Sequence, residues 1–371
     1  MIRVVHVITG LDVGGAELAL YRLLAATDPA RVRSAVISLT DVGPVGERIR
    51  ELGIPVRAFE MRRPERLPAA PARLVRLLRA SSPDVVQTWM HHADLLGGLA
   101  ARAAGIRPVV WGLRMSVADA TESRATRAVV AVNARLSHAV PQRILCCSDA
   151  VRRAHRDIGY AEDRMVVIEN GFEIPAADAD HGDLRAELGI ASDAPVIGRV
   201  GRFHPVKDHA TFARAAAVVQ RHHPDAAFVL CGLDVDDANT ELQAMFARGG
   251  VTNVHLLGPR DDMDRVYGTL DVLCSSSVGE GFPNVIGEAM ARGVPAVATD
   301  VGASADIVGP AGIVVPPRDP EALGAALSTL LSRTPEDRRR LGASAREHVE
   351  REFGMRRMVE RYESLYRTLL P

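Results

Sequence analysis

Short apolar runs alternate with longer amphipathic segments along nearly the whole chain, and this alternation limits the fold more than any other feature. The runs are too short for helices and rich in Val, Ile and Leu, which is typical of strands buried on both faces of a sheet. Strands alternating with helices of this size predict βαβ units and parallel sheets. The predicted strands are 4–8, 36–39, 85–88, 108–111, 143–147, 196–200, 228–230, 254–257, 272–274, 296–298 and 313–315.

The alternation is interrupted once, over residues 173–193, where Pro, Asp and the pair His181-Gly182 indicate a connector. The chain has 371 residues, enough for two domains with large buried cores. We therefore predict two α/β domains, each a doubly wound parallel sheet, over 1–172 and 194–352. A C-terminal helix over 353–371 follows them, and the chain is highly charged and helical from about Pro335 onward.

Composition excludes several classes of protein. The chain carries 45 Lys+Arg and 46 Asp+Glu residues, a net charge of −1, which argues against nucleic-acid binding. No apolar run approaches the ~20 residues that span a bilayer, and the first residues lack the layout of a signal peptide. We therefore expect a cytoplasmic protein. Four cysteines lack zinc-site spacing and are predicted to be buried thiols, with no metal bound: Cys146, Cys147, Cys231 and Cys274.

The richest candidate site follows the predicted strand 272–274. Pro283 is typical of a helix start, so the backbone N–H groups of Asn284 and Val285 would meet an anion at the positive helix end. Glu280 would lie outside this end, and Glu288 about one turn inside it. Amides and two carboxylates in this order fit the diphosphate and the two diols of a sugar nucleotide. The alternative is that both are ordinary surface acids near a helix start.

A second cluster follows the first predicted strand of the C-terminal domain. Arg202 and Lys207 would stand where a leaving pyrophosphate gathers negative charge, and such electrostatic stabilisation can replace a metal. The alternative is a pair of solvated loop cations. Asp208 is predicted to be the N-cap of the next helix rather than a catalytic group.

Four motifs, in order through both domains, resemble the signature set of family 4 glycosyltransferases. The first is a paired-glycine turn before a helix, which lets a ligand approach the backbone closely. The motifs are Gly14-Gly15-Ala16-Glu17, Asn170-Gly171-Phe172-Glu173, Gly201-Arg202…Lys207-Asp208, and Glu280 with Glu288. The resemblance covers nearly the whole chain. It implies the GT-B fold, with two Rossmann-like domains facing across a cleft, and a retaining enzyme that uses a nucleotide sugar, most often a UDP-sugar.

The resemblance implies a role for each matching residue. Arg202 and Lys207 would bind the donor diphosphate and form the catalytic set with Glu280, which would hold hydroxyls of the transferred sugar. Glu288 would hold the ribose. Further donor contacts would come from Gly15, Arg260, Gly281, Phe282, Pro283, Asn284 and Val285. Neither a metal nor a cofactor besides the nucleotide sugar is expected, and the last helix would pack back on the N-terminal domain.

The chain departs from the family pattern on the acceptor side. Many members carry a His in the loop after the fifth strand, where this chain has Arg114. We predict that Arg114, His91 or His92 faces the acceptor; the alternative is that the His pair is structural. The chain also has Asp306 where members often have Glu.

Arginines accumulate between residues 57 and 79: Arg57, Arg62, Arg63, Arg66, Arg73, Arg76 and Arg79. On a helix the last three lie opposite the apolar side chains of residues 74–78. Such a helix can dock on an anionic membrane surface, which predicts peripheral association with the cytoplasmic face of the membrane and a lipid-linked acceptor. The alternative is a core-facing helix with a solvated Arg face.

The resemblance implies a retaining hexosyltransferase that moves a sugar from a nucleotide sugar to a glycan or lipid-linked acceptor, in synthesis of a surface polysaccharide such as lipopolysaccharide or exopolysaccharide. The resemblance favours front-face attack; the alternative is a double displacement through a covalent intermediate, with Glu280 as the nucleophile. Two other functions stay open. A sugar-nucleotide isomerase would consume donor without an acceptor, and a catalytically idle protein would only bind it.

Overall fold

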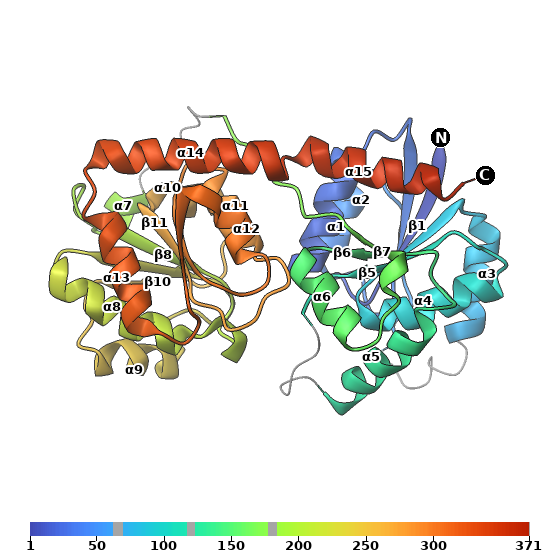
Figure 1. Cartoon of the computed structure of the whole chain (residues 1–371), viewed down its shortest axis with the longest axis horizontal. Coiled ribbons are helices and arrows are strands. Elements are labelled where there is room, and N and C mark those ends of the chain that lie inside the picture. Colours follow the sequence, from blue (N-terminus) through green and yellow to red (C-terminus); the bar gives the residue numbers. More distant parts are fainter. Residues whose placement is uncertain (62–69, 117–122, 177–183, 371) are drawn as a thin grey trace. The chain divides into compact units, whose positions relative to one another are not determined.

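The computed structural model describes residues 1–61, 70–116, 123–176 and 184–370. The chain forms two compact units (Figure 1). The first comprises Met1–Gly171 with Met355–Pro371, and the second comprises Phe172–Gly354. Three of the predicted arginines, Arg62, Arg63 and Arg66, lie outside the described residues, as does the pair His181-Gly182.

The first unit is built on a seven-stranded sheet in which every pair of neighbours is parallel. The strand order is β3-β2-β1-β4-β5-β6-β7, so the direction of winding reverses between β1 and β4. Ligands of doubly wound sheets bind at the carboxyl ends of the strands at such a switch point. The strands are β1 (Ile2–Ile8), β2 (Val32–Ser38), β3 (Val56–Ala58), β4 (Val85–Trp89), β5 (Val109–Leu113), β6 (Arg143–Cys146) and β7 (Met165–Val167).

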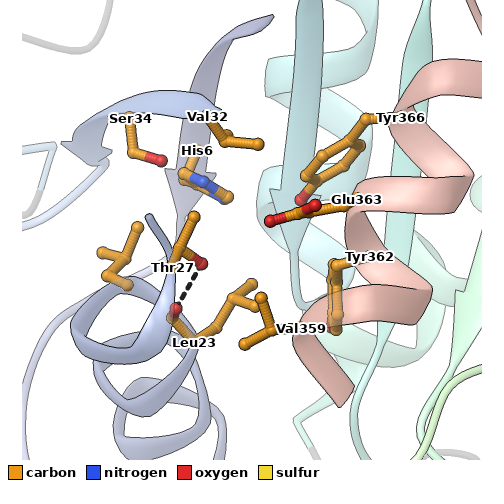
Figure 2. A pocket seen from close by; sticks show the side chains of 10 residues that line it. His6, Leu23, Thr27, Val32, Ser34, Val359, Tyr362, Glu363 and Tyr366 are labelled. Carbon is orange, nitrogen blue, oxygen red and sulfur yellow. Dashed lines mark hydrogen bonds between the residues drawn. The ribbon is translucent and has the colours of Figure 1, made fainter. Parts of the chain in front are cut away.

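The helices of this unit are α1 (Gly15–Ala26), α2 (Gly43–Glu51), α3 (Ala70–Ser81), α4 (His91–Ala103), α5 (Arg124–Leu136), α6 (Asp149–Asp157) and α15 (Met355–Thr368). The last of these comes from the far end of the chain and packs against α1 (Figure 1). Tyr362 and Tyr366 bury their rings in the core that α1, β1 and β2 form. They also line a small pocket with His6 and Glu363 (Figure 2). Burial lowers the pKa of His6 to about 3, so this imidazole stays neutral.

The second unit repeats the design with six parallel strands in the order β10-β9-β8-β11-β12-β13, and its switch point lies between β8 and β11. The strands are β8 (Val196–Val200), β9 (Ala227–Cys231), β10 (Val254–Leu256), β11 (Val272–Ser275), β12 (Ala296–Thr299) and β13 (Gly312–Val315). The helices are α7 (Leu184–Glu187), α8 (His209–His222), α9 (Thr240–Arg248), α10 (Met263–Thr269), α11 (Asn284–Met290), α12 (Ser304–Val308), α13 (Pro320–Leu331) and α14 (Pro335–Phe353).

The predicted fold class is confirmed: both sheets are parallel and doubly wound, and each predicted strand overlaps an observed one. The prediction missed β3 and β7. Each has three residues and lies at an edge of the first sheet, where a strand needs fewer apolar side chains than the central strands do. The four cysteines are buried, as expected.

Helix α3 contains the last three arginines of the arginine-rich stretch. Leu74 and Leu78 turn into the core of the first unit, whereas Arg73, Arg76 and Arg79 are exposed. The Arg79 guanidinium also donates to the carbonyl of Ala103 at 2.7 Å. The apolar face of α3 is therefore covered by protein, which supports the core-facing interpretation of this helix, and membrane association through its Arg face stays a prediction.

Candidate active site

The predicted catalytic residues lie in two loops that leave neighbouring strands of the second unit. The loop over 201–208 follows β8, and the loop over 276–283 follows β11. Because β8 and β11 pair in parallel at the switch point, their carboxyl ends lie side by side. A backbone hydrogen bond of 2.8 Å from Val278 N to the Val206 carbonyl joins the two loops.

Lys207 and Glu280 meet between these loops. Lys207 Nζ lies 2.6 Å from Glu280 Oε1, which also accepts a 2.7 Å hydrogen bond from Ser277 Oγ. The two charged side chains keep 23% and 13% of their surface exposed. A ligand can therefore reach the pair, while the surrounding protein leaves little water to screen its charges.

Buried side chains hydrogen-bond to the backbone carbonyls at Lys207 and Asp208. Ser276 Oγ donates to the carbonyls of Lys207 and Asp208 at 3.0 and 3.1 Å, and the guanidinium of Arg199 donates to the Lys207 carbonyl. Asp208 has a φ of 48° and caps α8 by accepting a 3.1 Å hydrogen bond from Thr211 N, which confirms its predicted role.

Gly302 packs closely against the backbone of the loop that carries Glu280. Gly302 has a φ of 59°, and a Cβ there would lie 2.4 Å from the carbonyl oxygen of Glu280. Both the backbone conformation and the close approach require glycine. Gly302 lies four residues before Asp306, the position where similar sequences often have Glu. The chain therefore keeps the glycine that this loop requires, although it has Asp in place of Glu.

The helix after this loop begins one residue later than predicted. Pro283 is the N-cap of α11 with a ψ of 89°, and Asn284 is the first helical residue. Either position suits proline, because its missing N–H is unpaired at both. The helix packs closely through Gly287, where a Cβ would lie 2.1 Å from the ring of Phe172. Phe172 in turn stacks on Phe282.

Glu288 and Arg260 have their own partners. Glu288 Oε2 accepts a 2.7 Å hydrogen bond from Tyr267 OH, so α10 orients this carboxylate. Arg260 Nε donates to Asp262 Oδ1 at 2.7 Å, and this carboxylate raises the pKa of the guanidinium. Arg202 is exposed, and the structure shows no ion pair for its side chain with any described residue. The structure thus brings Lys207 and Glu280 into contact, and it shows Arg260 paired with Asp262 and Glu288 hydrogen-bonded to Tyr267.

Three predicted residues of the first unit differ widely in exposure. Gly15 is exposed and begins α1, the helix that follows β1. His92 is half-buried at the start of α4, but His91 is only 2% exposed and its ring packs on His155. Burial lowers the pKa of His91 to about 3. The structure favours the structural role that the sequence left open for His91, whereas His92 stays an acceptor-side prediction.

Arg114 is tied into the first unit. Its guanidinium lies 4.2 Å above the ring of Trp89 and donates to Asn170 Oδ1 at 2.8 Å and to the hydroxyl of Tyr362 on α15. Arg114 therefore joins the end of β5 to β4 and to the C-terminal helix. Whether it also meets the acceptor stays a prediction.

We expect Arg114→Met to lower the free energy of unfolding of the first unit by about 2–4 kcal/mol, because charged hydrogen bonds and a cation–π contact are lost together. Trp89 and Trp111 are the chain's two tryptophans, and both are buried in this unit. Urea unfolding followed by tryptophan fluorescence therefore measures the effect. Arg107→Met, at an exposed position of the same unit, is the control. Equal stability of the two variants would contradict the anchoring role.

A buried carboxylic acid lies next to this region. Asp94 is fully buried in the first turn of α4, and its Oδ1 accepts hydrogen bonds from Thr88 Oγ1 at 2.5 Å and Gly112 N at 3.1 Å. Its Oδ2 has no partner among the described residues. Burial raises the pKa of Asp94 to about 7, although both hydrogen bonds and the charge of Arg114 act to lower it.

This raised pKa predicts a pH dependence. Between about pH 4 and 7 the unfolded chain loses the Asp94 proton while the folded unit keeps it, so stability falls as the pH rises through this window, by up to about 4 kcal/mol. Asp94→Asn mimics the protonated acid and should lose this slope. Urea unfolding of both proteins at pH 5, 6, 7 and 8 measures the difference, in which the titration of the buried histidines cancels. Parallel pH profiles would show that Asp94 does not titrate in this way.

Several residues of the site were not predicted to act there. Ser276 and Ser277 lie in the predicted loop, but only the structure shows which carbonyls and carboxylate they bind. Tyr267 lies outside every motif that the sequence analysis identified. Arg199 did have a signal, because a charged residue within an apolar strand is rarely buried without a reason. Among the described residues, no three His, Cys, Asp or Glu side chains cluster as a metal site. None of the described helices has the length and apolarity to cross a membrane.

Comparisons with known proteins agree with this layout. Residues 13–174 match the family model described as glycosyltransferase family 4, and residues 194–333 match the one described as glycosyl transferases group 1. EpsF of Bacillus subtilis, a glycosyltransferase by name, is 29% identical over 318 residues, which are 80% of this chain and 79% of EpsF.

Two further relatives extend the comparison. An Escherichia coli protein named UDP-Gal:alpha-D-GlcNAc-diphosphoundecaprenol alpha-1,3-galactosyltransferase is 27% identical over 240 residues, which are 62% of this chain and 60% of that protein. The crystal structure of Anabaena HepE in complex with UDP and glucose has a TM-score of 0.87 and 22% identity, covering 99% of this chain and 100% of HepE. At this identity, the likeness to HepE shows the fold alone.

Proposed function

Because the chain belongs to the family 4 glycosyltransferases, retaining enzymes of the GT-B fold that use nucleotide sugars, we propose that it transfers a hexose from a UDP-sugar to a glycan or lipid-linked acceptor. The contact between Lys207 and Glu280 carries this proposal. It joins a cation suited to a diphosphate with a carboxylate suited to sugar hydroxyls, at the switch point of the second sheet. UDP is the nucleotide in the printed name of the E. coli relative, and UDP is bound in the HepE structure.

The proposed reaction proceeds on one face of the sugar. The bond between the anomeric carbon and the diphosphate oxygen breaks, and its electron pair leaves with UDP. The acceptor hydroxyl bonds to the same face of this carbon and gives its proton to the leaving phosphate oxygen. Lys207 and Arg202 would stabilise the departing charge without a metal. Glu280 would hold the sugar hydroxyls and Glu288 the ribose, with Arg260, Gly15 and residues 281–285 completing the donor contacts.

A thermal-shift screen of UDP-, GDP-, ADP- and CMP-sugars tests the donor. Ligand at a hundred times its Kd adds about 2.7 kcal/mol to stability, so a bound UDP-sugar should raise Tm by several degrees. No shift with any of these sugars would contradict the proposal. Consumption of donor without an acceptor and without release of free sugar would instead indicate a sugar-nucleotide isomerase.

The chain offers a second, site-specific test. Lys207 is its only lysine, so acetic anhydride can acylate just one side-chain amine. The bound donor should protect Lys207 from acylation, measured by mass spectrometry, while the α-amino group of the chain reacts equally with and without ligand. Equal acylation of Lys207 in both samples would place the donor elsewhere.

For the acceptor we propose a glycan or a lipid-linked glycan of surface polysaccharide synthesis, with the enzyme working in the cytoplasm or at the cytoplasmic membrane face. The support is the diphosphoundecaprenol named for the E. coli relative and the exposed arginines of α3. Flotation with anionic liposomes compares the natural protein with a variant in which Arg73, Arg76 and Arg79 are replaced by Glu. Equal flotation would remove the membrane part of this proposal.

A further inference from the structure

A buried guanidinium lies directly beneath the Lys207 loop. Arg199 is the fourth residue of β8 and only 2% exposed, yet the structure shows no carboxylate paired with it among the described residues. Its one hydrogen bond to a described residue runs to the Lys207 carbonyl, and its Nε has no partner there. A buried charge without an ion-pair partner is costly, so its presence calls for a compensating role.

The neighbours of Arg199 do not neutralise it. Burial and the nearby cations lower the pKa of His209 to about 2, so this imidazole is uncharged. Burial raises the pKa of Cys274 to about 12, so its thiol stays protonated. The nearest carboxylates are otherwise engaged, Glu280 with Lys207 and Asp208 at the start of α8. Desolvation lowers the pKa of Arg199 itself only to about 10, which leaves the guanidinium charged at neutral pH.

We infer that Arg199 is a positioning residue of the donor site: it holds the backbone of Lys207 and places an unneutralised positive charge beneath the donor diphosphate. This inference rests on the proposed function. The two loops and β8 carry three cations, Arg199, Arg202 and Lys207, against two carboxylates, Glu280 and Asp208, which leaves one positive charge in excess. A bound diphosphate would supply the missing negative charge.

The test compares UDP with uridine, which lacks the phosphates. Arg199→Met should weaken UDP binding by about tenfold to a hundredfold and leave uridine binding unchanged. Ser276 Oγ still donates to the Lys207 carbonyl in this variant, so no carbonyl loses its last partner. Arg199 has no ion-pair partner among the described residues, so the substitution strands no buried carboxylate and removes the cost of burying a charge; Tm should therefore not fall. Calorimetry measures UDP binding, and an NMR titration measures uridine binding.

A second variant and a matched control separate the outcomes. Arg199→Gln keeps a donor for the Lys207 carbonyl but loses the charge, and it should also weaken UDP binding; it decides the matter if the Met variant does not fold. Arg185→Met removes another partly buried arginine of the same unit, one that pairs with Asp271 at 2.9 Å, and should lower Tm without changing UDP binding.

Unchanged UDP affinity in the Arg199 variants would overturn the inference. So would equal losses of UDP and uridine binding together with a fall in Tm, because they would indicate a merely structural role. If the natural protein itself binds no UDP in this assay, the proposed function fails, and the inference fails with it. The natural protein is therefore measured first, so that the two failures are told apart.

Discussion

Lys207→Ala should lower kcat by about 10²–10³-fold, the loss typical when one group that stabilises transition-state charge is removed. The departing diphosphate gathers negative charge in a site where Lys207 is 23% exposed and thus weakly screened by water. The measurement is UDP release from the donor that the screen identifies, with Tm as the check on folding. Turnover near that of the natural protein would reject the role of Lys207.

Arginine should not replace this lysine. The chain has one Lys among its 45 Lys+Arg residues, so nearly every other basic position uses arginine. Its compact ammonium fits 2.6 Å from Glu280 Oε1, beside a loop already held by Arg199. The planar guanidinium is larger and directs its hydrogen bonds differently. We expect Lys207→Arg to lose at least about tenfold in kcat, while the exposed Arg221→Lys should have no effect. Full activity of Lys207→Arg would show that any cation suffices.

Glu280→Gln is the second substitution with a large expected effect, and its size distinguishes two mechanisms. In front-face attack Glu280 only binds hydroxyls and balances Lys207, so kcat should fall by about 10²–10³-fold. In a double displacement Glu280 would be the carboxylate nucleophile, and its loss would cost about 10⁴-fold or more, as for essential catalytic groups. The amide keeps the shape of the side chain and can still accept from Ser277, so folding should be retained.

Steady-state turnover of Glu280→Gln, with the exposed Glu321→Gln as control, gives the answer. We expect residual activity well above the background without enzyme. A covalent glycosyl intermediate on Glu280, detected by mass spectrometry of the natural protein after mixing with donor, would contradict the front-face mechanism.

Local patterns in the sequence were sufficient for the fold class. The central strands follow from short apolar runs, because a strand buried on both faces must be apolar throughout. The role of Asp208 follows from its position before a helix. The loops over 201–208 and 276–283 follow strands in the sequence itself, so their place at the ligand-binding edge of a parallel sheet could be predicted before any contact was known.

The tertiary structure alone decided which side chains meet. Lys207 and Glu280 are 73 residues apart, and their contact depends on β8 and β11 being neighbours across the switch point. Sequence patterns report spacing along one element, but not which strands become neighbours. For the same reason, the sequence could not show that Arg114 would be tied to α15, or that Arg199 would lie buried beneath Lys207. The sequence determines the charge of each of these side chains. The role of each side chain depends on its burial and on partners that folding brings from far along the chain.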